Sequence, residues 1–509
     1  MKRCVERFLI VTPRIVSPAG VSPRIHQPFG SIIVLTEAKR CGFDVILFDS
    51  AVEGLKKNIL DSSYNPREIE NLEGINYWKT GLRIEEIITR VASINPDVIG
   101  LSCSNVSERN EVAKLATALK KSLSSIPLVL GGYEASLWYK EILGNTQFPI
   151  DEIPAIDFVV VGPGQPVINN LLLYLSDSTK YDLPKGVATR INNKVVFRGL
   201  PRFDYNRYSV ADFTLLPKIK IVGRLKPLDF YSYVGNPHAG KLEIILGSKN
   251  ISYFPITTSY GCGFNCSFCD ADKKLRRYKL ENVIRMIDAF ESLYGIDYID
   301  FMDNNFGGGN QDSRFLAFDI LAQIKKSGYQ IGFSNGLTFE SMAREDHRLI
   351  RQFADYGNVR HIAFPCENGN DRILRMIRKP HDIELVKKTL VFSSNVLQKT
   401  NREGFFIGGF PKTSGKLAET PQELENTYHF IRYCLEKGFL HQAIFLTLSP
   451  VTKEYRFLWR KLYPNASFEH CLFSRKTGIW PYPNVLLDEM HEKVKLINEQ
   501  LGRLVTRKL

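Results

Sequence analysis

The sequence contains no apolar run that approaches the roughly 18 residues a membrane span requires. Its first residues, MKRCVERFLIVTP, include basic side chains but an apolar run of only four residues, so we expect no signal peptide. No basic stripe interleaved with aromatic side chains is present either. We therefore expect no membrane span and no binding of nucleic acid.

Cysteine is sparse, and acidic residues are fewer than basic ones. The nine cysteines are scattered except for three on one loop, which indicates a reducing cytoplasmic location. Basic residues outnumber acidic ones by 67 to 54, and the net charge of +13 would suit an anionic substrate or serve solubility alone. With 509 residues and 44% hydrophobic content, the chain is long enough for two or three domains.

Short apolar runs alternate with helical patterns over the first third of the chain. Residues 8–11, 45–48 and 98–101 are predicted strands, and a helix is predicted around residues 84–91. Strands that are apolar throughout are typical of a parallel sheet covered by helices on both faces. We predict an α/β fold whose first domain, 1–180, is a Rossmann-like, doubly wound parallel sheet. Residues 181–250 show no sustained periodicity and are predicted to form a linker.

Small residues follow the predicted strands 98–101, 128–130 and 158–161, at the edge where doubly wound sheets bind ligands. They are Ser102, Ser104, Gly131, Gly132, Gly162 and Gly164. Each glycine alone could equally serve a tight turn between strand and helix. Together they would allow the backbone to approach a flat ligand closely.

From Pro255 onward, strand and helix patterns repeat about six times. The candidate strands are 255–259, 298–302, 330–334, 360–365, 403–408 and 442–447. Six units predict a partial (β/α)6 barrel over 251–450, followed by a loop-rich and helical C-terminal region over 451–509. Polar or glycine-rich stretches follow five of the strands, where barrel active sites lie. These stretches are 262–269, 303–305, 334–336, 367–369 and 408–411.

The first of these stretches, within ITTSYGCGFNCSFCDAD, holds Cys262, Cys266 and Cys269 in a C-x-x-x-C-x-x-C spacing. Thiolates suit iron–sulfur clusters and zinc. Three of them can hold three irons of a [4Fe-4S] cube and leave the fourth iron open to a small molecule. Structural zinc needs four closed ligands, and no second C-x-x-C or H-x-x-x-H pair lies nearby. The spacing therefore favours a cluster over zinc.

This loop, with Tyr260 and Gly261 before it and Phe268 beside its last cysteine, resembles the cluster loop of radical S-adenosylmethionine (SAM) enzymes. The preceding α/β pattern resembles the branch that carries an N-terminal cobalamin-binding domain. The resemblance extends from about residue 7 to about residue 450.

The resemblance implies a role for each stretch at the barrel edge. Cys262, Cys266 and Cys269 would hold the cluster, and SAM would bind its open iron. The further residues expected to contact SAM are Phe268 at the adenine, Met302, Asp303 and Asn304 at the methionine amino group, Glu367 at the ribose with Ser334 beside it, and Gly408 and Gly409 near the adenine.

For the first domain, the resemblance implies cobalamin bound between the Ser-containing turn, the Gly-Gly turn and the Gly162–Gly164 turn. The D-x-H-x-x-G motif, whose histidine ligates cobalt in many cobalamin proteins, is absent. His26 is the one histidine among the first 230 residues. Cobalamin would therefore bind without a histidine ligand, or the domain has lost its cofactor.

The resemblance implies a cobalamin-dependent methyltransferase that acts on an unactivated carbon through a 5′-deoxyadenosyl radical. Its partners would be a small-molecule substrate and an electron donor of the flavodoxin or ferredoxin type. A radical SAM enzyme with a non-methylated product, from a cyclisation, dehydration or rearrangement, is the alternative within the enzymes. A non-catalytic scaffold with a closed zinc or iron–sulfur site is the alternative from another class.

Overall fold

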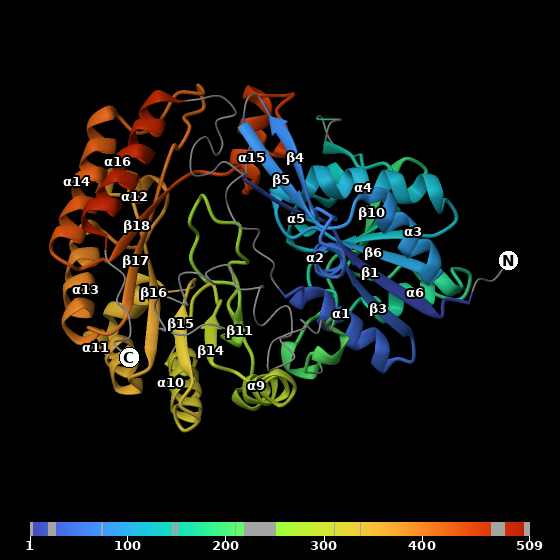
Figure 1. Cartoon of the computed structure of the whole chain (residues 1–509), viewed down its shortest axis with the longest axis horizontal. Helices are drawn as coiled ribbons and strands as arrows, with labels where there is room; N and C mark the ends of the chain where they lie inside the picture. The colour runs from blue at the N-terminus through green and yellow to red at the C-terminus, as the bar shows by residue number, and fades with distance from the viewer. Residues whose placement is uncertain are drawn as a thin grey trace. The chain divides into compact units, whose positions relative to one another are not determined.

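The computed structural model describes residues 4–18, 27–72, 75–144, 148, 151–208, 210–217, 251–309, 311–335, 337–469 and 484–502. The chain divides into two compact units (Figure 1). The N-terminal unit comprises Met1–Pro237 and Ser467–Leu472, and the C-terminal unit comprises His238–Ala466 and Phe473–Leu509. Among the described residues, no helix combines the length and the apolar character needed to cross a membrane.

The main sheet of the N-terminal unit has the strand order β10-β9-β8-β7-β6-β1-β3. Its five parallel strands are β1 (Arg7–Thr12), β3 (Asp44–Asp49), β6 (Val98–Ser102), β7 (Leu128–Gly131) and β8 (Phe158–Val160). The helices of this unit are α1 (Phe29–Arg40), α2 (Ser50–Leu60), α3 (Ile84–Ile94), α4 (Arg109–Ser122), α5 (Tyr133–Ile142) and α6 (Ile168–Ser176). The strands β1, β6 and β7 are largely buried, as their mostly apolar sequences predict.

The order of the parallel strands confirms the predicted doubly wound fold. The chain starts at β1, adds β3 on one side, and then adds β6, β7 and β8 in turn on the other. This is the flavodoxin-like variant, whose direction of winding reverses between β1 and β6. Ligands of such sheets bind at that reversal, outside the carboxyl ends of the strands.

Two further parts of the N-terminal unit were not foreseen. β9 (Val187–Ile191) and β10 (Lys194–Phe197) join the edge of the main sheet in antiparallel fashion, although they lie in the segment predicted as a linker. A separate antiparallel sheet contains β2 (Ile15–Pro18), β5 (Ile75–Thr80) and β4 (Arg67–Leu72). Residues 218–250 of the predicted linker lie outside the described residues.

The C-terminal unit contains the six-stranded parallel sheet predicted from the sequence, in the order β11-β14-β15-β16-β17-β18. Its strands are β11 (Tyr253–Ile256), β14 (Tyr298–Phe301), β15 (Gln330–Phe333), β16 (Val359–Glu367), β17 (Asn401–Gly408) and β18 (Gln442–Thr447). Because neighbours in sequence are neighbours in the sheet, the strands form an open barrel, which confirms the predicted partial barrel.

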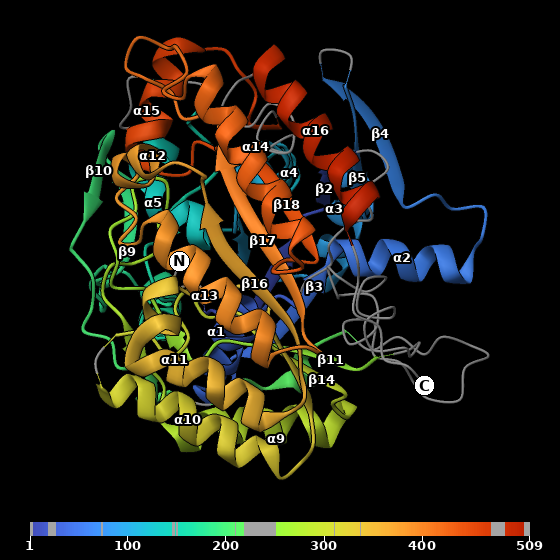
Figure 2. The ribbon, with the colours of Figure 1, turned by 90° about the vertical axis from the view of Figure 1, so that its left-hand side faces the viewer.

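Helices that connect the strands pack side by side along one face of this sheet (Figure 2). They are α9 (Leu280–Tyr294), α10 (Gln311–Lys325), α11 (Phe339–Tyr356), α12 (Asp371–Met376), α13 (Ile383–Val396) and α14 (Pro421–Glu436). The predicted last helix is α16 (Val485–Leu501), which Asn484 caps and which packs against α14 and β18. The helix α15 (Lys453–Leu462) lies in a stretch that we expected to be irregular.

Candidate active site

Every predicted site segment of the C-terminal unit follows a strand of the same parallel sheet. The cysteine loop follows β11, Met302–Asn304 follow β14, and Ser334 follows β15. Glu367 ends β16, and Gly408 ends β17. Since all six strands run in one direction, these segments share the carboxyl edge of the sheet.

The cysteine loop is closed by backbone hydrogen bonds that require a glycine at its entrance. The Cys262 N–H donates to the Asp272 carbonyl oxygen over 2.9 Å. Gly261 has a φ of +81°, and a Cβ there would lie 2.4 Å from the Lys274 carbonyl oxygen. A side chain at position 261 would therefore force the loop open.

The three thiols of the loop are free, partly buried and close enough to influence one another. Burial raises the pKa of Cys266 to about 11, the nearby Lys379 ammonium opposes that rise, and Cys269 and Cys262 add to it. Burial also raises the pKa of Cys269. Without a cation the Cys266 and Cys269 thiols stay protonated, whereas bound iron would displace their protons.

The thiols do not surround a single point. Among the residues that the structure describes, no three histidine, cysteine or acidic side chains are placed to hold one metal ion. A [4Fe-4S] cube does not need thiols that converge on one point, because each of its cysteines binds a different iron. Three neighbouring thiols on one short loop therefore fit a [4Fe-4S] cluster.

Asp303 supports the start of the cysteine loop. Its fully buried carboxylate accepts hydrogen bonds from the Thr258 N–H (3.1 Å), the Thr258 hydroxyl (2.8 Å) and the Ser259 hydroxyl (2.5 Å). Burial raises the pKa of Asp303. The carboxylate is thus engaged by the chain itself, while its neighbour Asn304 is exposed.

Glu367 is held by a cation that the sequence analysis missed. Glu367 is buried in the left-handed region at a φ of +61°, and its Oε1 atom lies 2.8 Å from the Lys379 Nζ atom. The same Nζ atom lies 5.5 Å from the centre of the Phe268 ring. Burial by itself lowers the pKa of Lys379, but the Glu367 carboxylate raises it overall. Lys379 thus links the predicted ribose and adenine residues.

The remaining segments of this edge are fixed by buried carboxylates. The Ser334 N–H donates to the Asp300 Oδ1 atom over 3.0 Å. The Gly409 and Phe410 N–H groups donate to Glu419 over 2.9 and 3.1 Å. Burial raises the pKa of Glu419 to about 7. Gly408 packs so tightly that a Cβ there would lie 2.5 Å from the Phe445 ring.

The predicted residues of the N-terminal unit lie at the carboxyl edge of its own sheet. The turns after β6 and β7 touch: a Cβ on Gly132 would lie 2.3 Å from the Cys103 carbonyl oxygen. A Cβ on Gly164 would lie 2.6 Å from the Val34 side chain, and the Gly162 N–H donates to Ser136. These glycines therefore serve close packing, whatever else they contact. His26 lies outside the described residues.

Lys379 could have been found from the sequence as the last member of a basic series. Arg372, Arg375 and Arg378 precede it at helical spacing, a pattern that is more typical of a solvated helix face. Arg372 does face solvent and binds Glu423. Lys379 differs because the chain leaves helical geometry at Arg378, whose φ is +59°.

Comparisons with known proteins match both units. The Radical SAM superfamily matches residues 256–411, and the B12 binding domain matches residues 19–172. Cytidylyl-2-hydroxyethylphosphonate methyltransferase from Streptomyces wedmorensis is 23% identical over 88% of this chain and 80% of its own length. Anaerobic magnesium-protoporphyrin IX monomethyl ester cyclase from Cereibacter sphaeroides is 23% identical over 68% of this chain and 50% of its own length.

Two solved structures share the fold. The cobalamin-dependent S-adenosylmethionine radical enzyme OxsB, solved with aqua-cobalamin and S-adenosylmethionine bound, has a TM-score of 0.60 and 14% identity; the match covers 91% of this chain but 56% of OxsB. The radical S-adenosylmethionine methyltransferase TsrM from Kitasatospora setae, solved with cobalamin and a [4Fe-4S] cluster, has a TM-score of 0.57 and 15% identity, over 90% of this chain and 75% of TsrM.

Proposed function

Because the chain belongs to the radical SAM enzymes that carry an N-terminal B12-binding domain, we propose that it methylates an unactivated carbon of a small-molecule substrate. Membership implies a [4Fe-4S] cluster, SAM and cobalamin as cofactors. The observation that carries the proposal is the presence of both domains in one chain, matched along most of its length by a named methyltransferase.

The roles of the residues form part of this proposal. Cys262, Cys266 and Cys269 hold the cluster, which their shared loop and partial burial support. Glu367 accepts hydrogen bonds from the ribose and Phe268 packs on the adenine, which their common neighbour Lys379 supports. Met302, Asp303, Asn304, Ser334, Gly408 and Gly409 complete the binding edge, with Asp303 acting through the loop that it fastens.

When bound, the cofactors supply the substrate radical and the methyl group. The chain then has three tasks: to hold the cluster loop in one conformation, to keep Glu367 oriented, and to shield the reacting atoms from water. The buried pair of Glu367 and Lys379 serves the second task.

Cobalamin is proposed to contact the carboxyl edge of the N-terminal sheet, at the turns containing Ser102, Ser104, Gly131, Gly132, Gly162 and Gly164. The reversal of winding between β1 and β6 supports this edge as the ligand site. The electron donor is proposed to be a flavodoxin or ferredoxin. An anionic substrate would suit the net charge of +13.

A non-methylating reaction is the second candidate, and the similarity to a cyclase favours it. The products separate the two reactions. Methyl transfer by this route consumes SAM twice, so S-adenosylhomocysteine and 5′-deoxyadenosine should accumulate together, near one of each per methylated product. The experiment incubates the anaerobically reconstituted enzyme with candidate substrates and quantifies both nucleosides. Substrate consumption with 5′-deoxyadenosine alone would establish the second candidate, and absence of SAM cleavage under reductant would indicate a scaffold.

A further inference from the structure

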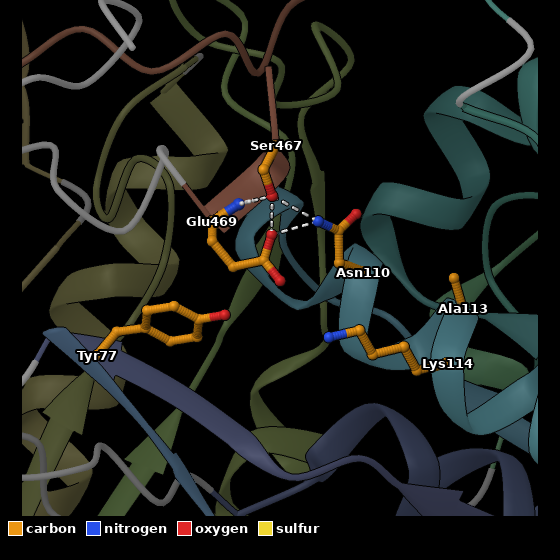
Figure 3. Close-up of a pocket in the computed structure, with 6 residues that line it drawn as sticks. All are labelled: Tyr77, Asn110, Ala113, Lys114, Ser467 and Glu469. Atoms are coloured by element: carbon orange, nitrogen blue, oxygen red, sulfur yellow. Dashed lines mark hydrogen bonds between the residues drawn. The ribbon is translucent and has the colours of Figure 1, made fainter. Parts of the chain in front are cut away.

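The N-terminal unit contains an open cavity of about 320 Å³, lined by polar and apolar atoms alike, that none of the assignments above uses. Three of its lining residues, Asn110, Ala113 and Lys114, lie on the first two turns of α4. Tyr77 of β5 lines another side, and Ser467 and Glu469 line a third (Figure 3). Because α4 follows β6, the cavity lies near the carboxyl edge of the sheet.

One wall of the cavity is fixed by a buried network of charges. The Glu111 carboxylate binds Arg14 over 2.5 Å and Lys79 over 3.1 Å. Lys79 also binds Glu70, and Glu70 accepts a hydrogen bond from the Tyr77 hydroxyl group. Since the proton of that group is committed to Glu70, the Tyr77 oxygen can offer the cavity only a lone pair, as an acceptor.

On the opposite wall, one carboxylate oxygen of Glu469 faces the cavity. Asn110 and Ser467 both donate to the Oε2 atom of Glu469, and this fixes the side chain. The Oε1 atom accepts no hydrogen bond from any residue that the structure describes, although Glu469 is only 3% exposed. In Figure 3 the Oε1 atom points into the space between Lys114 and Tyr77. A carboxylate oxygen in this position can accept a hydrogen bond from a donor that enters the cavity.

Lys114 supplies the third group. Its nearest carboxylate within the described residues is Glu70, at 3.8 Å, too far for a hydrogen bond. The cavity thus offers two acceptors, Glu469 Oε1 and Tyr77 Oη, and one donor, Lys114 Nζ. Its one negative and one positive charge suit a neutral ligand. A primary carboxamide has the complementary set, with two N–H donors and one carbonyl acceptor.

We propose that this cavity binds a primary carboxamide, whose two N–H groups donate to Glu469 and Tyr77 and whose carbonyl oxygen accepts from Lys114. Cobalamin carries primary carboxamides around its corrin ring, and the B12-binding match includes both Tyr77 and Lys114. The source of the carboxamide is therefore an amide arm of cobalamin. This assignment of the source rests on the proposed function, whereas the chemistry of the cavity does not.

The first test measures the affinity of the full chain for hydroxocobalamin by equilibrium dialysis. Glu469→Gln keeps an acceptor for Asn110 but turns an N–H group toward the ligand, so affinity should fall by about tenfold or more. Lys114→Met should weaken binding by several-fold. Lys121→Met, on the exposed last turn of the same helix, is the matched control and should bind like the wild type.

The second test uses N-acetylglutamine as a free carboxamide, with N-acetylglutamate as its carboxylate counterpart, in saturation-transfer NMR. The wild type should transfer saturation to N-acetylglutamine but not to N-acetylglutamate, and Glu469→Gln should abolish the transfer. If N-acetylglutamine binds in this way while hydroxocobalamin binds equally to wild type and variant, the carboxamide site stands and cobalamin as its source is overturned.

Failure of the proposed function is distinguishable from failure of this inference. If the wild type retains no cobalamin, the proposed function fails. Saturation transfer to N-acetylglutamine then decides by itself whether the cavity binds a carboxamide. If the wild type shows no transfer to N-acetylglutamine and Glu469→Gln leaves hydroxocobalamin binding unchanged, the carboxamide site itself is wrong.

Discussion

At the scale of single residues, the buried ion pair of Lys379 and Glu367 is the contact on which the candidate SAM site most depends. Both side chains are at most 9% exposed, and their charged atoms lie 2.8 Å apart. Breaking a buried pair by removing one partner costs about 3–5 kcal/mol, because the other charge is left unpaired. Exposed pairs are worth about 1 kcal/mol or less.

Lys379→Met should therefore lower the thermal midpoint of the protein markedly, and Lys379→Arg should lower it less. The matched control is Lys388→Met, which breaks an exposed pair with Glu384 at 3.5 Å and should change little. The double variant Lys379→Met, Glu367→Gln should lose less than the sum of the two single variants. Additive losses would show that the two charges do not interact.

Glu419 should give the C-terminal unit a distinctive dependence on pH. Its folded pKa of about 7 lies above the ordinary carboxyl value of 4.5 because burial disfavours the charge. Folding therefore favours the protonated form. Below pH 4.5 Glu419 has no effect, and its contribution becomes unfavourable as the pH rises toward 7, by about 3 kcal/mol in all.

Thermal midpoints of the wild type and of Glu419→Gln, compared from pH 5 to pH 8, test this dependence. The wild type should lose stability relative to the variant as the pH rises, because glutamine does not titrate. A constant difference between the two proteins across this range would contradict the raised pKa.

Cys266 should be indispensable for iron. Protein prepared without oxygen should hold about four irons and four sulfides per chain, as a cube requires. Cys266→Ala should abolish this content, because the remaining two thiolates leave two irons unsupported. Cys41→Ala, at an exposed position, is the control and should keep all of its iron. Full iron retention in Cys266→Ala would refute the cluster assignment.

At the scale of elements, the cysteine loop depends on the shape of its backbone as much as on its ligands. Gly261 and Gly263 both have positive φ angles, +81° and +85°. A Cβ on Gly261 would lie 2.4 Å from the Lys274 carbonyl oxygen, whereas a Cβ on Gly263 would meet nothing within 4 Å. The two positions therefore separate steric closure of the loop from backbone strain.

Gly261→Ala should lose most of the iron, while Gly263→Ala, with strain of about 1–2 kcal/mol alone, should keep most of it. Iron content and the charge-transfer absorption of the reconstituted variants measure the effect. Equal iron contents would show that close approach at Gly261 does not hold the loop together.

At the scale of the whole molecule, the absence of a D-x-H-x-x-G motif predicts cobalamin without a histidine on cobalt. The absorption spectrum of the bound cofactor should be that of a base-off form, and His26→Ala should leave it unchanged. If the wild type fails to retain cobalamin through gel filtration, the domain has lost its cofactor and methylation is not its reaction. A spectrum that changes in His26→Ala would indicate a histidine ligand after all.

The sequence alone determined the class of both folds and singled out the cysteine loop. Continuous apolar runs and apolar helix faces that repeat every 3.6 residues are local signals. The doubly wound sheet and the six barrel strands could therefore be predicted from them. The spacing of Cys262, Cys266 and Cys269 is likewise local. The segments predicted to bind SAM needed one further rule, that parallel strands share a carboxyl edge.

Only the tertiary structure decided which distant side chains meet. Lys379 was one basic residue in a series until the turn at Arg378 placed it on Glu367. The contact of Asn110 with Ser467 joins residues 357 positions apart, and no periodic pattern in the sequence predicts it. The edge strands β9 and β10 were missed for the same reason: short strands are specified by their pairing partners more than by their own residues.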